Sequence, residues 1–414
     1  MKVKLHLLLW SLALVLVSAC SDDDKPKIPE PPAIGEERTV LVYWVGDNNL
    51  SNYALNDFNE MVEGAVGIDA TKNNLVVYSD VRNAAPQLIH ISKQSGVVVA
   101  DTVYTYEEQN SLKKDVMSGI MSKVITEFPA KSYGLVFASH ADGWMEATKS
   151  SNTRHIGDYR GYQMDITDFR EVLEGIHAKE GIDPLEFILF DACYMQAIEV
   201  AYELRNVTKY VVGSPTEIPA PGAPYQKVVP FMFSSSAAID IANAYYSYYG
   251  NTDGTIRADA EYINEYGELK LWTGGVSVSV LKTSELDDLA AATADVLADY
   301  AGNKTSTNTY SLFDYGYSEG KGGYARYYDL DQLIEYVTGE YTGDYEHWRP
   351  FFDKAQPYFK TTDKCYANRK NGSFSMDGAS GVSTCVLHTN VGFLDFYRTL
   401  QWYTDGNVWQ SSGW

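Results

Sequence analysis

Positive charge is scarce in this chain. Its 414 residues include 33 Lys and Arg against 55 Asp and Glu, which gives a formal net charge of −22. A surface this acidic repels phosphate backbones and anionic lipid headgroups, so neither nucleic acid nor an anionic membrane surface is expected as a partner. Hydrophobic residues make up 45% of the chain, which is ordinary for a globular protein that buries a large core.

Cysteine is also scarce, with four residues in the whole chain. No His/Cys cluster has the spacing of a zinc site and no stretch has EF-hand spacing, so no metal is expected. Cys365 and Cys385 lie in one C-terminal region and could form a disulfide in an oxidising exterior. Cys20 ends the N-terminal apolar run. That leaves one cysteine over, Cys193, and an odd cysteine in an exported protein is a candidate reactive thiol.

Long apolar runs are lacking beyond the N-terminus, so no transmembrane helix is expected after residue 20. Lys2 and Lys4 precede an apolar run at 5–17, as in a secretory signal. The run ends in Val17-Ser-Ala-Cys20, which resembles a bacterial lipoprotein cleavage site with Cys20 as the lipidated residue. An ordinary secretory signal cleaved nearby is the alternative.

An acidic stretch, Ser21-Asp-Asp-Asp24, follows and resembles the tag that sends some Gram-negative lipoproteins to the outer cell surface. Several prolines between 25 and 37 indicate a stiff tether. The expected organisation is a lipoprotein signal peptide over 1–20, an acidic, proline-rich tether over 21–37 and one domain over 38–414. We expect a lipid anchor in the outer membrane of a Gram-negative bacterium, with the domain exposed at the cell surface.

Within that domain, apolar runs alternate with amphipathic helical patterns. Core strands are expected at 39–45, 74–80, 133–138, 187–190, 209–213 and 275–281, with a last strand at 382–387 and a smaller hairpin at 88–92 and 97–104. Helices are expected after residue 50 and at 112–128, 166–178, 237–249, 284–300, 330–337 and 345–359, and a polar linker at 146–161. Apolar strands separated by helices predict an α/β fold with a mostly parallel sheet covered on both faces. No internal repeat is apparent, and no strong linker between domains follows residue 37, which indicates one compact unit with an elaborated second half.

The stretch Phe187-Ile-Leu-Phe-Asp-Ala-Cys-Tyr-Met195 holds the odd cysteine. Its apolar residues end at Asp191, and Met195 and Ile198 then begin a helical spacing. Cys193 is therefore expected between a core strand and a helix, where backbone N–H groups and the helix dipole favour the nucleophilic thiolate. The plain alternative is a small, buried, apolar residue.

A histidine follows another core strand, 133–138, directly after Ser139. Ligands bind at the carboxyl ends of parallel strands, so His140 and Cys193 would face one crevice if their strands are neighbours. A Cys–His pair suffices for acyl transfer, because the imidazole takes the thiol proton and later protonates the leaving amine. The backbone N–H groups of Ala141 and Cys193 could stabilise the oxyanion.

Taken in order, these motifs resemble the clostripain family of cysteine peptidases. The resemblance covers 38–340 and rests on Val40-Leu-Val-Tyr-Trp-Val-Gly-Asp-Asn-Asn-Leu50, Ser139-His140, Asp191-Ala-Cys-Tyr-Met195 and Tyr328-Asp-Leu-Asp-Gln-Leu333. It implies a caspase-like three-layer sandwich with an elaborated C-terminal part. It also implies a cysteine endopeptidase, expected to be a monomer, that hydrolyses protein or peptide substrates with His140 as general base and Cys193 as nucleophile.

Members of this family commonly cleave after Arg or Lys and use acidic residues in the primary specificity pocket. By motif position Asp191 matches one such acid, and a cap on the following helix is its structural alternative. The second acid is expected in a Gly-rich loop after the next strand. This chain has Ala220-Pro-Gly-Ala223 there, with only Glu217 nearby, so a basic preference and a different preference both stay open.

The resemblance has further implications for maturation and cofactors. Some relatives cut themselves between the histidine and cysteine strands, where Arg154 is the candidate site and an ordinary exposed arginine is the alternative. Calcium activates some members, and this resemblance is the one ground for a cofactor. The family histidine is commonly followed by Gly, but here by Ala141. That change, the altered pocket loop and 32 tyrosines motivate an alternative function, a catalytically impaired surface lipoprotein that binds rather than cleaves.

Overall fold

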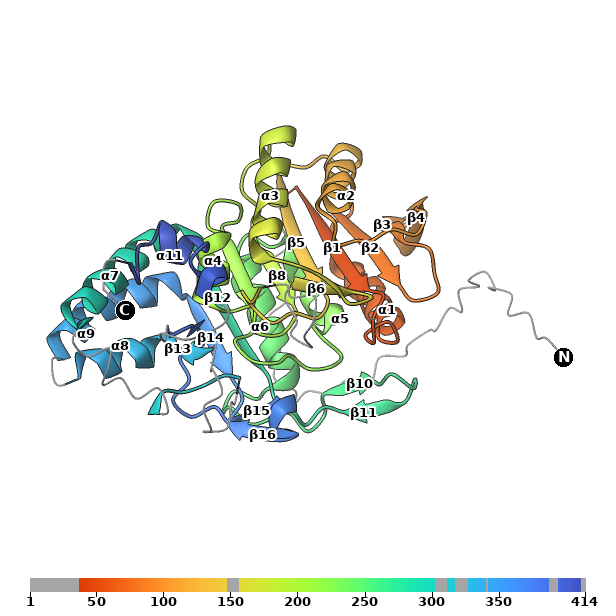
Figure 1. Cartoon of the computed structure of the whole chain (residues 1–414). Coiled ribbons are helices and arrows are strands. Elements are labelled where there is room, and N and C mark those ends of the chain that lie inside the picture. The colour runs from red at the N-terminus through yellow and green to blue at the C-terminus, as the bar shows by residue number, and fades with distance from the viewer. Residues whose placement is uncertain are drawn as a thin grey trace. The chain divides into compact units, whose positions relative to one another are not determined.

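Nine strands form one central sheet in the computed structural model, which describes residues 37–146, 156–301, 311–316, 327–339, 342–386 and 394–410. Their spatial order is β14-β12-β9-β8-β5-β1-β2-β3-β4 (Figure 1). The strands are β1 (Arg38–Gly46), β2 (Asn74–Val81), β3 (Gln87–Gln94), β4 (Val97–Thr105), β5 (Ser132–Ala138), β8 (Ile188–Asp191), β9 (Tyr210–Gly213), β12 (Ser277–Lys282) and β14 (Tyr358–Thr361). The neighbours β9, β8, β5, β1 and β2 run parallel, and antiparallel strands extend both edges.

Helices cover both faces of this sheet. They are α1 (Ala54–Gly64), α2 (Lys114–Glu127), α3 (Ile166–Glu180), α4 (Ile198–Glu203), α5 (Tyr225–Val228), α6 (Ala237–Tyr249), α7 (Leu286–Asp299), α8 (Leu330–Thr338), α9 (Thr342–Ala355), α10 (Leu394–Tyr397) and α11 (Gln401–Thr404). Smaller two-stranded sheets pair β6 (Ile156–Tyr159) with β7 (Tyr162–Met164), β10 (Glu261–Ile263) with β11 (Leu269–Leu271), β13 (Tyr328–Asp329) with β17 (Ser383–Thr384), and β15 (Lys364–Ala367) with β16 (Gly372–Ser375).

Side chains of β1 show how the layers form. Val40 and Val42 pack into one core with α1, α5 and α6, whereas Leu41 and Tyr43 pack into the other with α2, α3, α7, α8 and α9. Alternate side chains of a strand point to opposite faces, so a strand buried on both faces is apolar throughout. The expected three-layer α/β sandwich with a mostly parallel sheet is confirmed (Figure 1). No helix within the described residues has the length and hydropathy to cross a bilayer.

The C-terminal part departs from the sequence prediction. The helix expected at 345–359 is α9, which ends at Ala355, and β14 follows it as the outermost strand of the sheet. Pro357 explains this break, because proline removes a helical N–H and disfavours helical backbone in the residue before it. The last expected strand, 382–387, is the two-residue β17, and the expected linker 146–161 contains β6.

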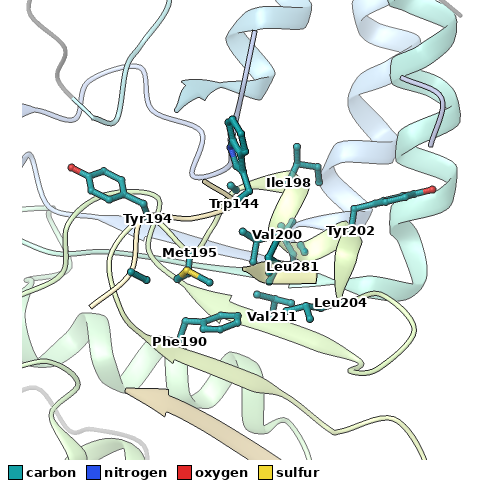
Figure 2. Close-up of a cluster of buried hydrophobic side chains, with 14 of the residues drawn as sticks. Trp144, Phe190, Tyr194, Met195, Ile198, Val200, Tyr202, Leu204, Val211 and Leu281 are labelled. Carbon is teal, nitrogen blue, oxygen red and sulfur yellow. The ribbon is translucent and has the colours of Figure 1, made fainter. Parts of the chain in front are cut away.

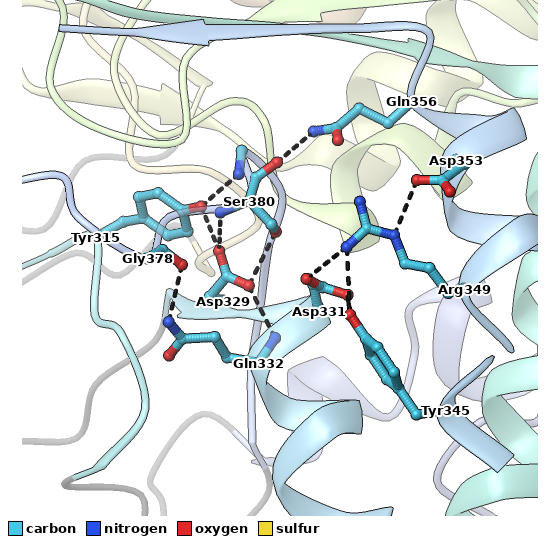
Figure 3. Close-up of polar contacts among 11 residues, drawn as sticks. Tyr315, Asp329, Asp331, Gln332, Tyr345, Arg349, Asp353, Gln356, Gly378 and Ser380 are labelled. Carbon is cyan, nitrogen blue, oxygen red and sulfur yellow. Dashed lines mark hydrogen bonds and ion pairs between the residues drawn. The ribbon is translucent and has the colours of Figure 1, made fainter. Parts of the chain in front are cut away.

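A buried carboxylate joins this part to the sheet (Figure 3). Asp329 is fully buried and caps α8, with its Oδ1 accepting from the N–H of Gln332 at 3.0 Å. Its Oδ2 accepts from the hydroxyl of Tyr315 at 2.5 Å and from the N–H of Ser380 at 2.7 Å. The carbonyl of Ser380 in turn accepts from Gln356 at 2.8 Å. The segment Tyr328-Asp-Leu-Asp-Gln-Leu333 therefore has a structural role.

Candidate active site

The ends of β5 and β8 lie side by side, with Ala138 paired to Asp191 in parallel register. His140 and Cys193 follow these two strand ends. Both line one cleft of about 760 Å³. The structure thus brings together the two residues that the sequence analysis selected for acyl transfer.

Cys193 lies between β8 and α4, as expected, but it sits in a turn and not next to the first residue of the helix. The helix α4 begins five residues later, at Ile198, and has only 6 residues. The backbone of Tyr194 is left-handed, with φ at 61°, and its N–H donates to Thr216 O at 3.0 Å. The N–H of Ile218 points to Cys193 Sγ at 3.5 Å. An N–H group of a loop, and not the first turn of a helix, therefore lies next to the thiol.

The turn is held by the side chains on either side of the thiol. Left-handed backbone costs about 1–2 kcal/mol in a residue other than glycine, so it persists where the surroundings fix it. The Tyr194 ring stacks on Tyr327 with centroids 4.7 Å apart, and its hydroxyl donates to Glu217 Oε1 at 3.1 Å. Met195 points into the core beside Phe190 (Figure 2). Cys193 itself is partly exposed.

His140 is 8% exposed, and its ring is oriented by a residue that the sequence analysis missed. Its Nε2 lies 2.5 Å from Asn49 Oδ1. An amide oxygen only accepts, so Nε2 is the donor in this contact. Asn49 entered the prediction only as part of the motif from Val40 to Leu50 and had no role of its own. Its role could have been predicted from its position, because Asn49 follows β1, and β1 is the neighbour of the strand β5 that precedes His140.

The hairpin β6–β7 holds the backbone of the histidine segment through hydrogen bonds. The N–H of Gly157 donates to His140 O at 2.8 Å, and the N–H of Asp158 donates to Ser139 Oγ at 3.1 Å. This hairpin follows residues 147–155 directly. Arg154, the candidate self-cleavage site, falls in that segment and lies outside the described residues, as does Cys20.

Asp191 lies on the floor of the cleft and is 5% exposed. Its Oδ1 accepts from the N–H of Ala223 at 2.8 Å, and its Oδ2 accepts from the Tyr225 hydroxyl at 2.9 Å. Burial raises the pKa of this carboxyl to about 6, against the hydrogen bonds from Tyr225 and Ala223, which lower it. The helix-cap alternative for Asp191 is wrong, because Ala197 occupies the N-cap position of α4.

Two more acids line the same cleft. Glu217 belongs to the rim, where its Oε1 accepts from Tyr194 and, at 3.0 Å, from the N–H of Asn368. Asp57 comes from the buried face of α1 and is 3% exposed. Asp57 was not among the predicted site residues, although it stands among the apolar positions of that helix.

The hairpin β10–β11 contributes another wall of the cleft, through Tyr262, Leu271 and other residues. Glu265 at its tip accepts from the hydroxyl of Tyr53 at 2.8 Å. Among the described residues that line the cleft, four carry carboxylates and one, Arg82, carries a guanidinium. Carboxylates therefore outnumber cationic side chains among these residues.

The disulfide considered for Cys365 and Cys385 is absent from the structure, in which both are buried thiols. Cys365 Sγ lies 3.7 Å from Thr361 Oγ1, and burial raises the pKa of its thiol to about 11. The N–H of Cys385 donates to Glu199 Oε1 at 2.8 Å. Each thiol therefore packs in its own environment.

One group of acids within the described residues converges closely enough to hold a metal, namely Asp47, Asp80 and Glu108. Arg160 already pairs with two of them, at 2.6 Å to Asp47 and 3.3 Å to Glu108. Calcium takes six to eight oxygen ligands. The guanidinium of Arg160 already compensates the charge of two of these carboxylates, and activation by calcium stays a prediction from the family resemblance.

Comparisons with known proteins agree with this geometry. The sequence model of the clostripain family matches residues 42–411. A secreted C11 cysteine protease from Bacteroides thetaiotaomicron, solved with an irreversible peptide inhibitor, is 40% identical with a TM-score of 0.76, and the match covers 91% of this chain and 99% of that one. An inactive zymogen C11 protease from Parabacteroides distasonis is 30% identical with a TM-score of 0.74, covering 90% and 99%. Clostripain from Hathewaya histolytica is 26% identical over 225 residues, which are 46% of this chain and 41% of clostripain.

Proposed function

The chain belongs to the clostripain family of cysteine peptidases, and we propose that it is an endopeptidase whose catalytic groups are Cys193 and His140. One observation carries the proposal. The two side chains line a single acidic cleft at the carboxyl ends of the adjacent parallel strands β5 and β8. The bond from His140 to Asn49 supports it further, because it fixes the orientation of the imidazole.

In the proposed reaction, Cys193 Sγ attacks the carbonyl carbon of the scissile bond, and its proton passes to the imidazole of His140. The resulting oxyanion accepts hydrogen bonds from the N–H groups of Cys193 and Ala141. Collapse of this intermediate breaks the C–N bond, and the imidazolium protonates the leaving amine. Water then hydrolyses the thioester and returns the proton to the sulfur.

We propose that the bond cleaved is the one after Arg or Lys. The support is the position of Asp191, whose carboxylate lies on the floor of the cleft that Cys193 lines. An ionised carboxylate there pairs with a guanidinium or ammonium group that water no longer solvates. Glu217 on the rim adds to the negative potential of the same cleft.

We also propose that Cys20 carries the lipid that anchors the chain to the outer membrane, with the peptidase exposed at the cell surface. The support is the sequence alone, Val17-Ser-Ala-Cys20 followed by Ser21-Asp-Asp-Asp24. In a detergent phase separation, the wild-type chain is expected in the detergent phase and Cys20→Ser in the aqueous phase. Equal partitioning of the two proteins would refute the anchor.

The catalytic proposal is tested with Cys193→Ala, His140→Ala and, as a matched thiol control, Cys365→Ala. The first two are expected to lower kcat/KM on a fluorogenic peptide by more than about 1000-fold, while the control keeps it. At neutral pH, iodoacetamide is expected to label the wild-type protein and Cys365→Ala quickly but Cys193→Ala slowly. Undiminished cleavage by either dyad variant overturns the assignment, and a wild-type protein that cleaves no peptide supports the surface-binding alternative.

A further inference from the structure

Asp57 occupies a position that the helical pattern reserves for an apolar side chain. It lies between Ala54 and Met61 on the buried face of α1 and is 3% exposed. Its Oδ2 has no hydrogen-bond partner among the described residues. Burying a carboxylate oxygen in this way is costly, so a native protein that keeps one has a use for it.

The surroundings of Asp57 are acidic. Burial is the largest effect that raises the pKa of this carboxyl well above its usual value, and the charges of Asp191 and then Glu60 raise it further. Glu60, one turn further along α1, is itself held by the N–H of Tyr225, which donates to its Oε2 at 3.0 Å. A buried acid among other acids is stabilised when a cation arrives.

Asp57 also lines the same cleft as Cys193 and Asp191. Each oxygen of Asp191 already accepts a hydrogen bond from the protein, through Ala223 and Tyr225. Oδ2 of Asp57 accepts none from the described residues. Of these two carboxylates, Asp57 is therefore the one better able to accept a hydrogen bond from a ligand.

The loop at 220–223 explains why a second acid would come from a helix. This loop carries no acid and instead buttresses Asp191: the N–H of Ala223 binds the carboxylate, and a Cβ at Gly222 would lie 2.6 Å from Oδ2 of Asp191. Ala220 and Gly222 of this loop line the cleft and offer no carboxylate to a ligand.

We propose that Asp57 is the second acid of the primary specificity pocket and accepts a hydrogen bond from the ammonium or guanidinium group of the P1 residue, which precedes the cleaved bond. The inference rests on the proposed function. The P1 cation lies between Asp57 and Asp191, and Asp57 takes the place of an acid that the loop lacks.

The test uses the full-length protein and three fluorogenic peptides that differ only at P1, with Lys, Arg or norleucine. Asp57→Asn keeps the shape of the side chain and removes its charge. We expect kcat/KM for the Lys and Arg peptides to fall about 10- to 100-fold, as for loss of a charged hydrogen bond. The norleucine peptide should change less than about twofold. Glu63→Gln, which removes one exposed charge from the same helix, should leave all three values unchanged.

The outcomes separate this inference from the function on which it rests. Equal losses on all three peptides would show that Asp57 is merely structural, and unchanged Lys and Arg values would show that it does not contact P1. Either result overturns the role of Asp57 while the dyad stands. A wild-type protein that cleaves the norleucine peptide as fast as the others overturns the basic pocket altogether. If Asp57→Asn fails to unfold cooperatively, Asp57→Ser is measured in its place.

Discussion

Replacing Tyr225 with Phe should change the pH dependence of substrate choice. The hydroxyl of Tyr225 donates to Oδ2 of Asp191 at 2.9 Å, and both side chains are buried. A buried hydrogen bond to a charged group contributes about 1.5–3 kcal/mol. This bond favours the ionised carboxyl, so its loss should raise the pKa of Asp191 from about 6 by about 1 to 2 pH units.

The assay follows the ratio of kcat/KM for a Lys peptide to kcat/KM for a norleucine peptide as a function of pH. Taking the ratio cancels the titration of Cys193 and His140, which act on both peptides. For the wild-type protein the ratio should rise as pH increases through about 6, where the carboxyl of Asp191 ionises. For Tyr225→Phe the same rise should occur about 1 to 2 pH units higher.

The free energy of unfolding should also depend on the protonation of Asp191. The folded-state pKa of Asp191 is raised above its ordinary value, so its contribution to stability is present at low pH and is lost as pH rises through about 6. In Tyr225→Phe the free energy of unfolding should keep falling up to a higher pH, because the pKa of Asp191 is higher there. Urea unfolding should therefore show a small difference between the proteins at pH 5 and about 1.5–3 kcal/mol at pH 8.

Tyr249→Phe is the matched control, because it removes an equally buried hydroxyl that donates to the neutral carbonyl of Gly222 at 2.9 Å. It should lower stability without shifting the ratio profile. A Tyr225→Phe profile that superimposes on the wild-type profile would refute the reasoning, since it would mean that ionisation of Asp191 does not govern P1 choice.

Two other substitutions test the positioning of the site. Asn49→Ala removes the acceptor of His140 Nε2 and is expected to lower kcat about 100-fold at unchanged KM. Asn49→Asp keeps an acceptor and should recover much of the rate. Equal losses of kcat in the two variants would contradict the orienting role. Gly222→Ala places a Cβ 2.6 Å from Oδ2 of Asp191 at a φ of +73°, whereas Gly254→Ala meets open space at a φ of +85°. Both should lower the unfolding midpoint, but only Gly222→Ala should also lower kcat/KM for Lys peptides, and equal kinetics for the pair would show that the loop adapts.

Local patterns in the sequence predicted the parallel core of the sheet. Strands such as β1 and β8 are runs buried on both faces, and α6 occupies the predicted range 237–249. The strand ends then placed His140 and Cys193 at one edge. These features could be predicted because they depend on periodicity and on the direction of neighbouring strands.

The remaining features depend on contacts between distant parts of the chain. The outermost strand, β14, is a four-residue segment that forms a strand because it pairs with β12. Asn49 became an orienting residue because of a contact with a histidine 91 positions away. Asp57 is a polar residue on an apolar helix face, and its place in the lining of the cleft depends on how α1 packs against the sheet.

Tyr194 shows why the C-terminal part belongs to the catalytic apparatus. Glycine would adopt the left-handed conformation after the nucleophile without strain, so the side chain of Tyr194 must compensate for the cost. It does so by stacking on Tyr327, whose hydroxyl donates to Asp142 O at 2.6 Å, two residues after the histidine. A residue from near β13 thereby fixes the turn of Cys193 and the end of the His140 segment together. The elaborated second half of the chain thus helps to set the geometry between nucleophile and base.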